Sequence, residues 1–279
     1  SRFISQLELI KTPLSQKIIA PQITTDKKEL TEIEKNEEVL KALKELAFKG
    51  ISPSTITNYL YNPIAFYKQK ILHIKEIESV EETIAANTMG TVVHDTLDEL
   101  YTPYINTFLT CNHVDLMLQK HKEIVKKYFF KHFKNGEILT GKNRISFEIS
   151  KRFVERFLTM EKKDLNEGNQ LKIIGTELNL ETQISVPNIN FPIKIRGIVD
   201  RIDLYNGTLR IIDYKTGNVK AGDLKVVNFE EIQSVKYSKA IQILLYAYMY
   251  SQQIFFDKEK SLEAGIISFK NLKSGLLKV

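Results

Sequence analysis

An Asn-Gly pair at Asn206 and Gly207 separates the apolar segments "IKIRGIVDRIDLY" and "TLRIIDYK" and constrains the fold more than any other feature of the sequence. Both central positions of a two-residue hairpin turn need a positive φ, which Asn and Gly tolerate best. We therefore predict two antiparallel strands joined at this pair, with Tyr205 opposite Thr208. The turn also sets the pairing of every residue farther from it.

Counting along this register brings two acids face to face. Asp200 comes opposite Asp213, and Lys215 lies on the same face because strand side chains repeat every second residue. Two carboxylates at ~5 Å repel by ~3 kcal/mol at an effective dielectric of ~20. Either a proton shared by the two acids or a divalent cation between them would remove this repulsion. Asp203 has a simpler explanation, since it faces Arg210 as a cross-strand ion pair.

Two carboxylates, a hard cation and an ammonium suit an attack on a phosphate group. Oxygen ligands favour Mg²⁺, Mn²⁺ or Ca²⁺. Such a metal polarises a phosphoryl oxygen and activates water. Lys215 would position that water or stabilise the charge that grows in the transition state. If a cation rather than a shared proton relieves the repulsion, the hairpin predicts a site for metal-dependent attack on phosphate.

The rest of the chain divides into a helical part and a part rich in strands. The apolar spacing predicts helices near 89–104, 113–134 and 144–165, strands between 171 and 215, a helix near 236–254 and a last strand at "AGIISFK". This order indicates an α/β fold with a mixed sheet and flanking helices. Residues 1–50 are predicted to form an extended lead-in and an amphipathic packing helix within 24–50.

Two segments allow a structural and a nucleic-acid interpretation. The segment "SPSTITNYLYNPIAFY" holds four aromatic residues, which we interpret as core rather than as a platform for stacking bases: Tyr59, Tyr61, Phe66 and Tyr67. The Lys- and His-rich run in the helix near 113–134 is interpreted as a solvated face, and phosphate contact is the alternative.

Composition excludes some classes of protein and permits others. Forty Lys and Arg against 34 Asp and Glu give a net charge of +6, which permits nucleic acid as a partner without demanding it. The single cysteine, Cys111, excludes a disulfide framework and favours a reducing compartment. No apolar run approaches the ~20 residues of a membrane span, so we expect no membrane partner.

Taken together, the motifs resemble the core of PD-(D/E)XK nucleases, in the branch of the RecB and AddB nuclease domains. That branch has an acid on one strand and Asp-x-Lys on the next, matched here by Asp200 and by Asp213 and Lys215 in "DYKTG". "MGTVVHDTLDELY" resembles its upstream helix, whose histidine joins the metal shell, and this implies a metal ligand at His94. The likeness runs from about Ser52 to Phe269.

Other site residues are implied by the same resemblance. "QILLY" resembles a Gln-x-x-x-Tyr helix motif and places Gln242 and Tyr246 along a nucleic-acid groove. "IIGTEL" resembles the first core strand and places Glu177 at the rim of that groove. The implied ligands of Mg²⁺ or Mn²⁺ are His94, Asp200, Asp213 and the carbonyl of Tyr214, with Lys215 acting on the water.

The resemblance also implies a function and partners. We expect a restriction-endonuclease-like core at 51–279, acting as a cytoplasmic deoxyribonuclease, in particular an exonuclease of double-strand-break repair and recombination. Its substrate would be single-stranded DNA or a duplex end. The chain would be cut from a longer protein, with a helicase region in the same chain or in a companion subunit. Asn62 stands where some AddB-like members carry a cluster cysteine, so no iron–sulfur cluster is predicted.

Two other functions remain open at this stage. The domain could be an inactive module that holds DNA for a helicase complex. It could also be a different metal phosphoesterase, acting on RNA or on a small nucleotide.

Overall fold

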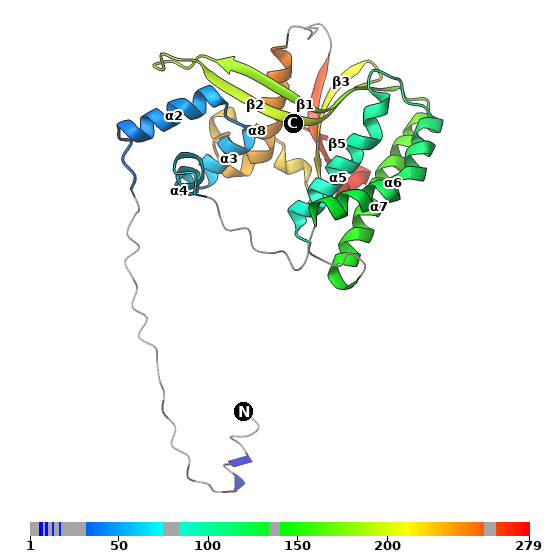
Figure 1. Ribbon diagram of the computed structural model, residues 1–279, viewed down its shortest axis with the longest axis horizontal. Helices are drawn as coiled ribbons and strands as arrows, with labels where there is room; N and C mark the ends of the chain where they lie inside the picture. The colour runs from blue at the N-terminus through cyan, green and yellow to red at the C-terminus, as the bar shows by residue number, and fades with distance from the viewer. Residues whose placement is uncertain are drawn as a thin grey trace. The chain divides into compact units, whose positions relative to one another are not determined.

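The computed structural model describes residues 32–74, 84–133, 140–253 and 261–279, and before them only positions 6, 7, 9, 10, 13 and 17. By its internal contacts the chain divides into Ser1–Asn36 and a compact unit, Glu37–Val279. All the elements discussed below belong to the second unit (Figure 1). None of the helices in the described part of the chain combines the length and the apolar character that a bilayer crossing requires.

The unit is a mixed sheet with helices on both faces. The helices are α2 (Glu37–Lys49), α3 (Pro53–Tyr61), α4 (Pro63–Phe66), the π-helical turn η1 (Tyr67–Ile71), α5 (Ala86–Tyr101), α6 (Cys111–His132), α7 (Gly141–Asn166) and α8 (Ser238–Ser251). The strands are β1 (Leu171–Ile184), β2 (Ile193–Tyr205), β3 (Thr208–Lys215), β4 (Leu262–Ser268) and β5 (Leu276–Lys278). Short 3-10 turns are η2 (Thr102–Tyr104), η3 (Ala221–Asp223), η4 (Phe229–Glu231), η5 (Val235–Tyr237) and η6 (Phe269–Ser274).

The sheet separates two apolar cores. Its strand order follows the chain, β1-β2-β3-β4-β5, with β3 and β4 parallel and the other neighbours antiparallel. Ile212 and Tyr214 face the core under α5, α6 and α7, whereas Leu209 and Ile211 face the core under α8. Figure 1 shows α5, α6 and α7 together on one side and α8 on the other. The alternating side chains of β3 therefore reach both layers.

The predicted fold class and hairpin are confirmed. The register runs from Tyr205 opposite Thr208 to Arg201 opposite Ile212, and Asn206 has a φ of +49°. The three helices predicted before residue 166 and the helix before the last strands are present as α5, α6, α7 and α8. α2 is shorter than the helix predicted within 24–50, because residues 32–36 are not helical and residues 24–31 lie outside the described part.

The strand predicted as the last one is followed by another. The chain turns at Gly275, whose φ is +60°, and β5 pairs with β4. A Cβ on Gly265 of β4 would lie only 2.3 Å from the Leu277 carbonyl oxygen, so glycine permits this close approach.

The interpretation of the four aromatic residues near α3 as core is wrong. Tyr59 and Tyr61 are 45% and 73% exposed, and Phe66 and Tyr67 are only half-buried. Asn62 caps α4 immediately after α3 ends, so two short helices follow each other here. The rings of Tyr59 and Phe66 instead contact each other edge to face, with centroids 5.2 Å apart.

A buried arginine joins the sheet to the helices on one face. Arg201 of β2 is fully buried, and its guanidinium lies 2.7 Å from Glu161 of α7 and 2.6 Å from Asp203. It also lies over the ring of Tyr101 of α5, 4.8 Å from the centroid. Arg210 bonds the other side of Asp203 at 2.7 Å, which confirms the predicted cross-strand ion pair. Each charged group of this network lies within ion-pair distance of an opposite charge, which offsets the cost of burying it.

We expect Arg201→Met to lower the free energy of unfolding by ~3–5 kcal/mol. Asp203 would keep Arg210, but Glu161 would remain buried without a cation. Urea unfolding measures the change. Lys127→Met is the control, because it breaks an exposed ion pair with Glu99 and should cost at most ~1 kcal/mol. An equally small change for Arg201→Met would show that the network does not stabilise the fold.

Candidate metal centre

The β2–β3 ladder ends just before the two acids that the sequence analysis paired. Its last pair is Arg201 with Ile212, so the predicted pairing of Asp200 with Asp213 is not made. β2 stays paired with β1 and β3 with β4, and the two strands therefore separate. We call this opening, bordered by Asp200, Asp213 and Tyr214, the β2–β3 fork.

Side chains replace the missing ladder bonds at the fork. The Tyr214 backbone N–H donates to Oδ2 of Asp200 at 2.6 Å. Nε2 of His94 donates to the Tyr214 carbonyl oxygen at 2.9 Å, since that oxygen can only accept. An unpaired backbone group in a buried position costs free energy. The carboxylate of Asp200 removes this cost for the Tyr214 N–H, so the ladder can end at this point.

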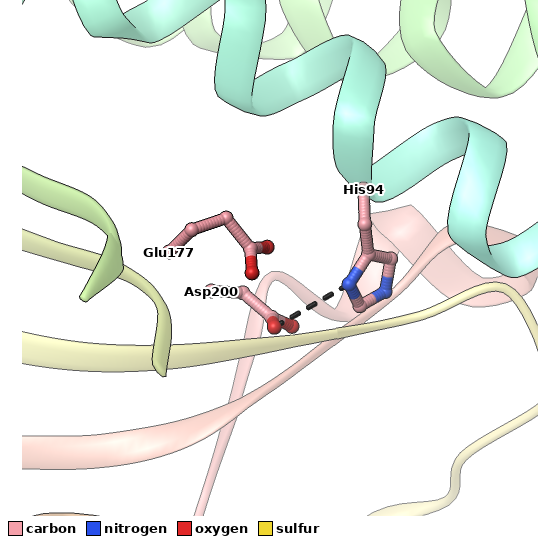
Figure 2. A group of neighbouring side chains, drawn as sticks. All are labelled: His94, Glu177 and Asp200. Carbon is pink, nitrogen blue, oxygen red and sulfur yellow. Dashed lines mark ion pairs between the residues drawn. The ribbon is translucent and has the colours of Figure 1, made fainter. Parts of the chain in front are cut away.

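Helix α5 brings His94 over the fork. Nδ1 of His94 lies 3.3 Å from Oδ1 of Asp200, the contact drawn as a dashed line in Figure 2. Both ring nitrogens therefore face an oxygen of the fork, one on Asp200 and one on Tyr214. The histidine that the resemblance implied as a ligand thus contacts two of its implied partners.

Glu177 approaches the same pair from β1. One carboxylate oxygen of Glu177, one of Asp200 and a ring nitrogen of His94 all lie within 4.8 Å of one another (Figure 2). Glu177 has a φ of +44°, which is rare for a residue with a Cβ and strained in a strand. The family resemblance implied that this acid lies at the rim of a groove, and no sequence pattern shows such a backbone conformation.

Asp213 makes a different set of contacts. Lys215 Nζ lies 2.8 Å from Oδ2 of Asp213 and 3.1 Å from its Oδ1. Gln242 of α8 donates to Oδ1 at 2.9 Å and to the hydroxyl of Tyr246 at 3.1 Å. In the described part of the chain, Asp213 is not within the three-residue group of His94, Glu177 and Asp200. The structure therefore brings the implied residues together in two neighbouring sets.

Tyr246 also borders a groove beside the fork. The groove has a volume of about 740 Å³ and runs between the start of α3 and the β1–β2 pair, with Arg196 and Ile198 in its wall. The ring of Tyr246 lies over Gly197, where a Cβ would come within 2.8 Å of it. Tyr246 is thereby held against β2 and, through Gln242, next to Asp213.

Burial and a neighbouring negative charge raise the pKa values of two acids at the fork. Burial, and then the charge of Asp200, raise the pKa of Asp213 to about 6 and that of Glu177 to about 7. Burial alone would lower the pKa of His94, but its hydrogen bond to Asp200 and the charges of Asp200 and Asp213 outweigh burial and raise it to about 9. The fork thus favours a positive charge at its centre.

The donor set fits a divalent cation. Imidazole and carboxylate ligands together suit Mn²⁺, and carboxylates and a backbone carbonyl suit Mg²⁺. His94, Glu177 and Asp200 are close enough to share one ion, and the Tyr214 carbonyl lies beside His94. Such an ion would also relieve the repulsion that raises the pKa values of the acids.

Glu177→Gln is expected to raise the melting temperature of the metal-free protein at about pH 8 and to leave it nearly unchanged at about pH 5. The pKa of Glu177 in the folded chain is about 7, above its ordinary value, so the folded chain holds a proton that the unfolded chain has already released. Stability therefore falls as the pH rises through this window, and glutamine removes the loss. Thermal unfolding in a chelator, followed by circular dichroism, measures both values.

The control for this prediction is Glu155→Gln, which changes an exposed residue of α7. Its melting temperature should follow that of the wild type at both pH values. A gain for Glu177→Gln that is equal at the two pH values would show that ionisation is not its cause.

Comparison with known proteins places the chain in a family. It matches the PD-(D/E)XK nuclease superfamily over residues 50–276. It is 29% identical over 207 residues to a subunit of the ATP-dependent helicase/deoxyribonuclease of Clostridium perfringens strain SM101, covering 69% of this chain and 17% of that protein. Proteins of Rickettsia felis and Rickettsia conorii named only as uncharacterized are 26% and 25% identical over 171 residues, which is 61% of this chain and 19% of each. The chain spans less than a fifth of the length of these relatives. Because the family match extends over most of its length, the chain belongs to the PD-(D/E)XK nuclease superfamily.

Proposed function

We propose that this chain is a metal-dependent deoxyribonuclease domain that hydrolyses phosphodiester bonds of DNA. The observation that carries the proposal is the β2–β3 fork, where His94, Glu177 and Asp200 converge next to a lysine held by Asp213. A cation site and a nearby ammonium are the parts that phosphodiester hydrolysis needs. Membership of a nuclease superfamily supports the same function.

Each residue of the fork has a role in this proposal. His94, Asp200 and the Tyr214 carbonyl hold Mg²⁺ or Mn²⁺, with Glu177 as a further ligand. The bound ion supplies Lewis-acid stabilisation of the phosphoryl oxygen and an acidified water. Lys215 orients the attacking water and stabilises negative charge as it develops. Asp213, which the resemblance implies as a ligand, also holds Lys215 at 2.8 Å.

Residues of α8 support the fork and the substrate groove. Gln242 fixes one oxygen of Asp213, so that the carboxylate cannot turn away from Lys215. Tyr246 joins this contact to the groove of about 740 Å³ beside α3. We propose that the substrate strand approaches the fork along this groove.

The wider role is drawn from the relatives. Three of them, all from Clostridium perfringens, are named as a subunit of an ATP-dependent helicase/deoxyribonuclease. We propose that this domain acts in the cytoplasm as an exonuclease of double-strand-break repair and recombination, on a strand supplied by a helicase region of the same protein or of a companion subunit.

Asp213→Asn and Lys215→Ala should each lower the rate of DNA cleavage by about 10³-fold or more, because the first removes the carboxylate that holds Lys215 and the second removes the ammonium that stabilises charge at the reacting phosphate. Both variants should fold and bind DNA as the wild type does. Cleavage of labelled single-stranded DNA, duplex DNA and RNA, with Mg²⁺ or Mn²⁺ and with a chelator, measures the effect and the substrate class. Lys225→Ala, at an exposed lysine, is the control.

Two outcomes of that experiment would contradict the proposal. Full cleavage by a clean preparation of either variant would remove the mechanism. DNA binding by the wild type without metal-dependent cleavage would favour the alternative of an inactive DNA-binding module.

His94→Asn and Asp200→Asn should weaken Mn²⁺ binding by about 100-fold or more, because loss of a ligand costs at least as much as loss of a residue that supports one. Glu177→Gln should weaken it as well, since Glu177 lies within 4.8 Å of both. Isothermal titration calorimetry measures the affinities. His132→Asn is the matched control, a histidine of α6 that pairs with Asp95. Unchanged affinity in Asp200→Asn would place the ion elsewhere.

A further inference from the structure

A basic pocket lies on the face of the sheet that α7 covers, apart from the fork. It has a volume of about 680 Å³ and is formed by α7 and by η6, the turn that follows β4. Figure 1 shows the red C-terminal segment against α7, in agreement with the contacts between η6 and α7. We define the basic pocket by its four cations, Arg156, Lys163, Lys270 and Lys273.

These cations have almost no counter-charge. Within the described ranges, no carboxylate lines the basic pocket, and neither Arg156, Lys270 nor Lys273 forms an ion pair there. Lys163 lies 3.6 Å from Glu167, and both side chains are mostly exposed. Like charges that converge on one hollow repel one another unless an anion joins them. The basic pocket is therefore complementary to a group with several negative oxygens.

The apolar part of the basic pocket connects it to the fork. The ring of Phe269 lies 5.7 Å from that of Tyr214, whose carbonyl faces His94. Ser268, one residue earlier, is the β4 partner of Lys215. Strands lie ~4.8 Å apart and two residues span at most ~7 Å, so the Cα of Lys270 is within ~12 Å of that of Lys215. Lys215 lies on the α8 face of the sheet and the basic pocket on the α7 face, but β3 and β4 both end here. A strand that crosses this end of the sheet passes from Lys215 to these cations.

We propose that the basic pocket binds backbone phosphates of the nucleic-acid strand whose neighbouring phosphate lies at the fork. This inference rests on the proposed function and extends it to a second contact. A guanidinium and ammonium groups suit phosphate oxygens, and such contacts position a strand without reading its sequence. Phe269 is only 3% exposed, so its ring has no free face on which a base could stack. The contact is therefore with the backbone and independent of sequence.

The test is the triple variant Arg156→Gln, Lys270→Gln and Lys273→Gln. Its affinity for a labelled single-stranded oligonucleotide is measured by fluorescence anisotropy in a chelator, so that no cleavage occurs, over a series of salt concentrations. Each lost phosphate contact lowers the slope of log K against log salt by about 0.7, so we expect a fall of up to about 2 and a loss of affinity of about tenfold or more at low salt. Two oligonucleotides of different sequence should be affected equally.

A second triple variant controls for net charge. Lys120→Gln, Lys122→Gln and Lys126→Gln remove the same charge from the exposed basic run of α6 and should change the slope much less. An equal fall in both variants would overturn the proposal, because net charge alone would explain it. An unchanged slope in the Arg156, Lys270 and Lys273 variant would also overturn it. Tight binding of polyglutamate by the wild type together with that result would assign the basic pocket to an acidic protein segment.

Cleavage is measured separately, in the presence of metal, so that the two hypotheses fail in different ways. A wild type that cleaves DNA, with a pocket variant that binds like it, contradicts only the inference about the basic pocket. A wild type that never cleaves, with a pocket variant that loses salt-dependent binding, contradicts only the nuclease assignment.

Discussion

The geometry of the fork depends on the buried guanidinium of Arg201. It bonds Glu161 of α7 and Asp203 of β2 and lies over Tyr101 of α5. His94 is two turns before Tyr101 on the same helix, and Asp200 directly precedes Arg201 on the same strand. One buried cation thus sets the position of α5 relative to β2, and through it the distance between the imidazole and the carboxylate. The candidate metal site therefore lies next to a buried ion-pair network that joins the sheet to α5 and α7.

The fork is stable because side chains satisfy the groups that the open ladder leaves. A simple separation of β2 and β3 would leave the N–H and carbonyl of Tyr214 without partners, at the cost of two buried polar groups. Asp200 accepts from the N–H, and His94 donates to the carbonyl. The residues that hold the fork open are therefore the same ones that face its centre. A cation that binds there competes with the proton of His94 for these oxygens.

The hairpin and its register are predictable from the sequence up to the point where side chains compete with the backbone for hydrogen bonds. The Asn-Gly turn and the period of two predict every pair from Tyr205–Thr208 to Arg201–Ile212, including the ion pair of Asp203. Pairing rules do not include a carboxylate that takes a ladder N–H, so the end of the ladder at Asp200 could not be predicted. The residues around Glu177 contain no pattern that predicts its positive φ. The exposure of Tyr61 depends on how the chain packs where α3 ends and α4 begins. Pro63 indicates that a helix breaks there, but it does not determine how the two helices pack.

The positions of the charges on the molecule say more about phosphate binding than the net charge does. A net charge of +6 spread evenly over the surface would attract any polyanion weakly. Here the acids gather at the fork, where burial and the charge of Asp200 raise the pKa values of Asp213 and Glu177, and four cations gather in the basic pocket, of which only Lys163 has an acidic partner in the described part of the chain. Without a metal, protonated His94 and Lys215 offset the acids of the fork, so the fork alone attracts a phosphodiester little. A divalent cation adds positive charge at the fork, and the basic pocket is already positive, so a phosphate strand is attracted to both when the metal is present. Substrate binding and metal binding at the fork should therefore be cooperative, with each raising the affinity for the other by the same factor.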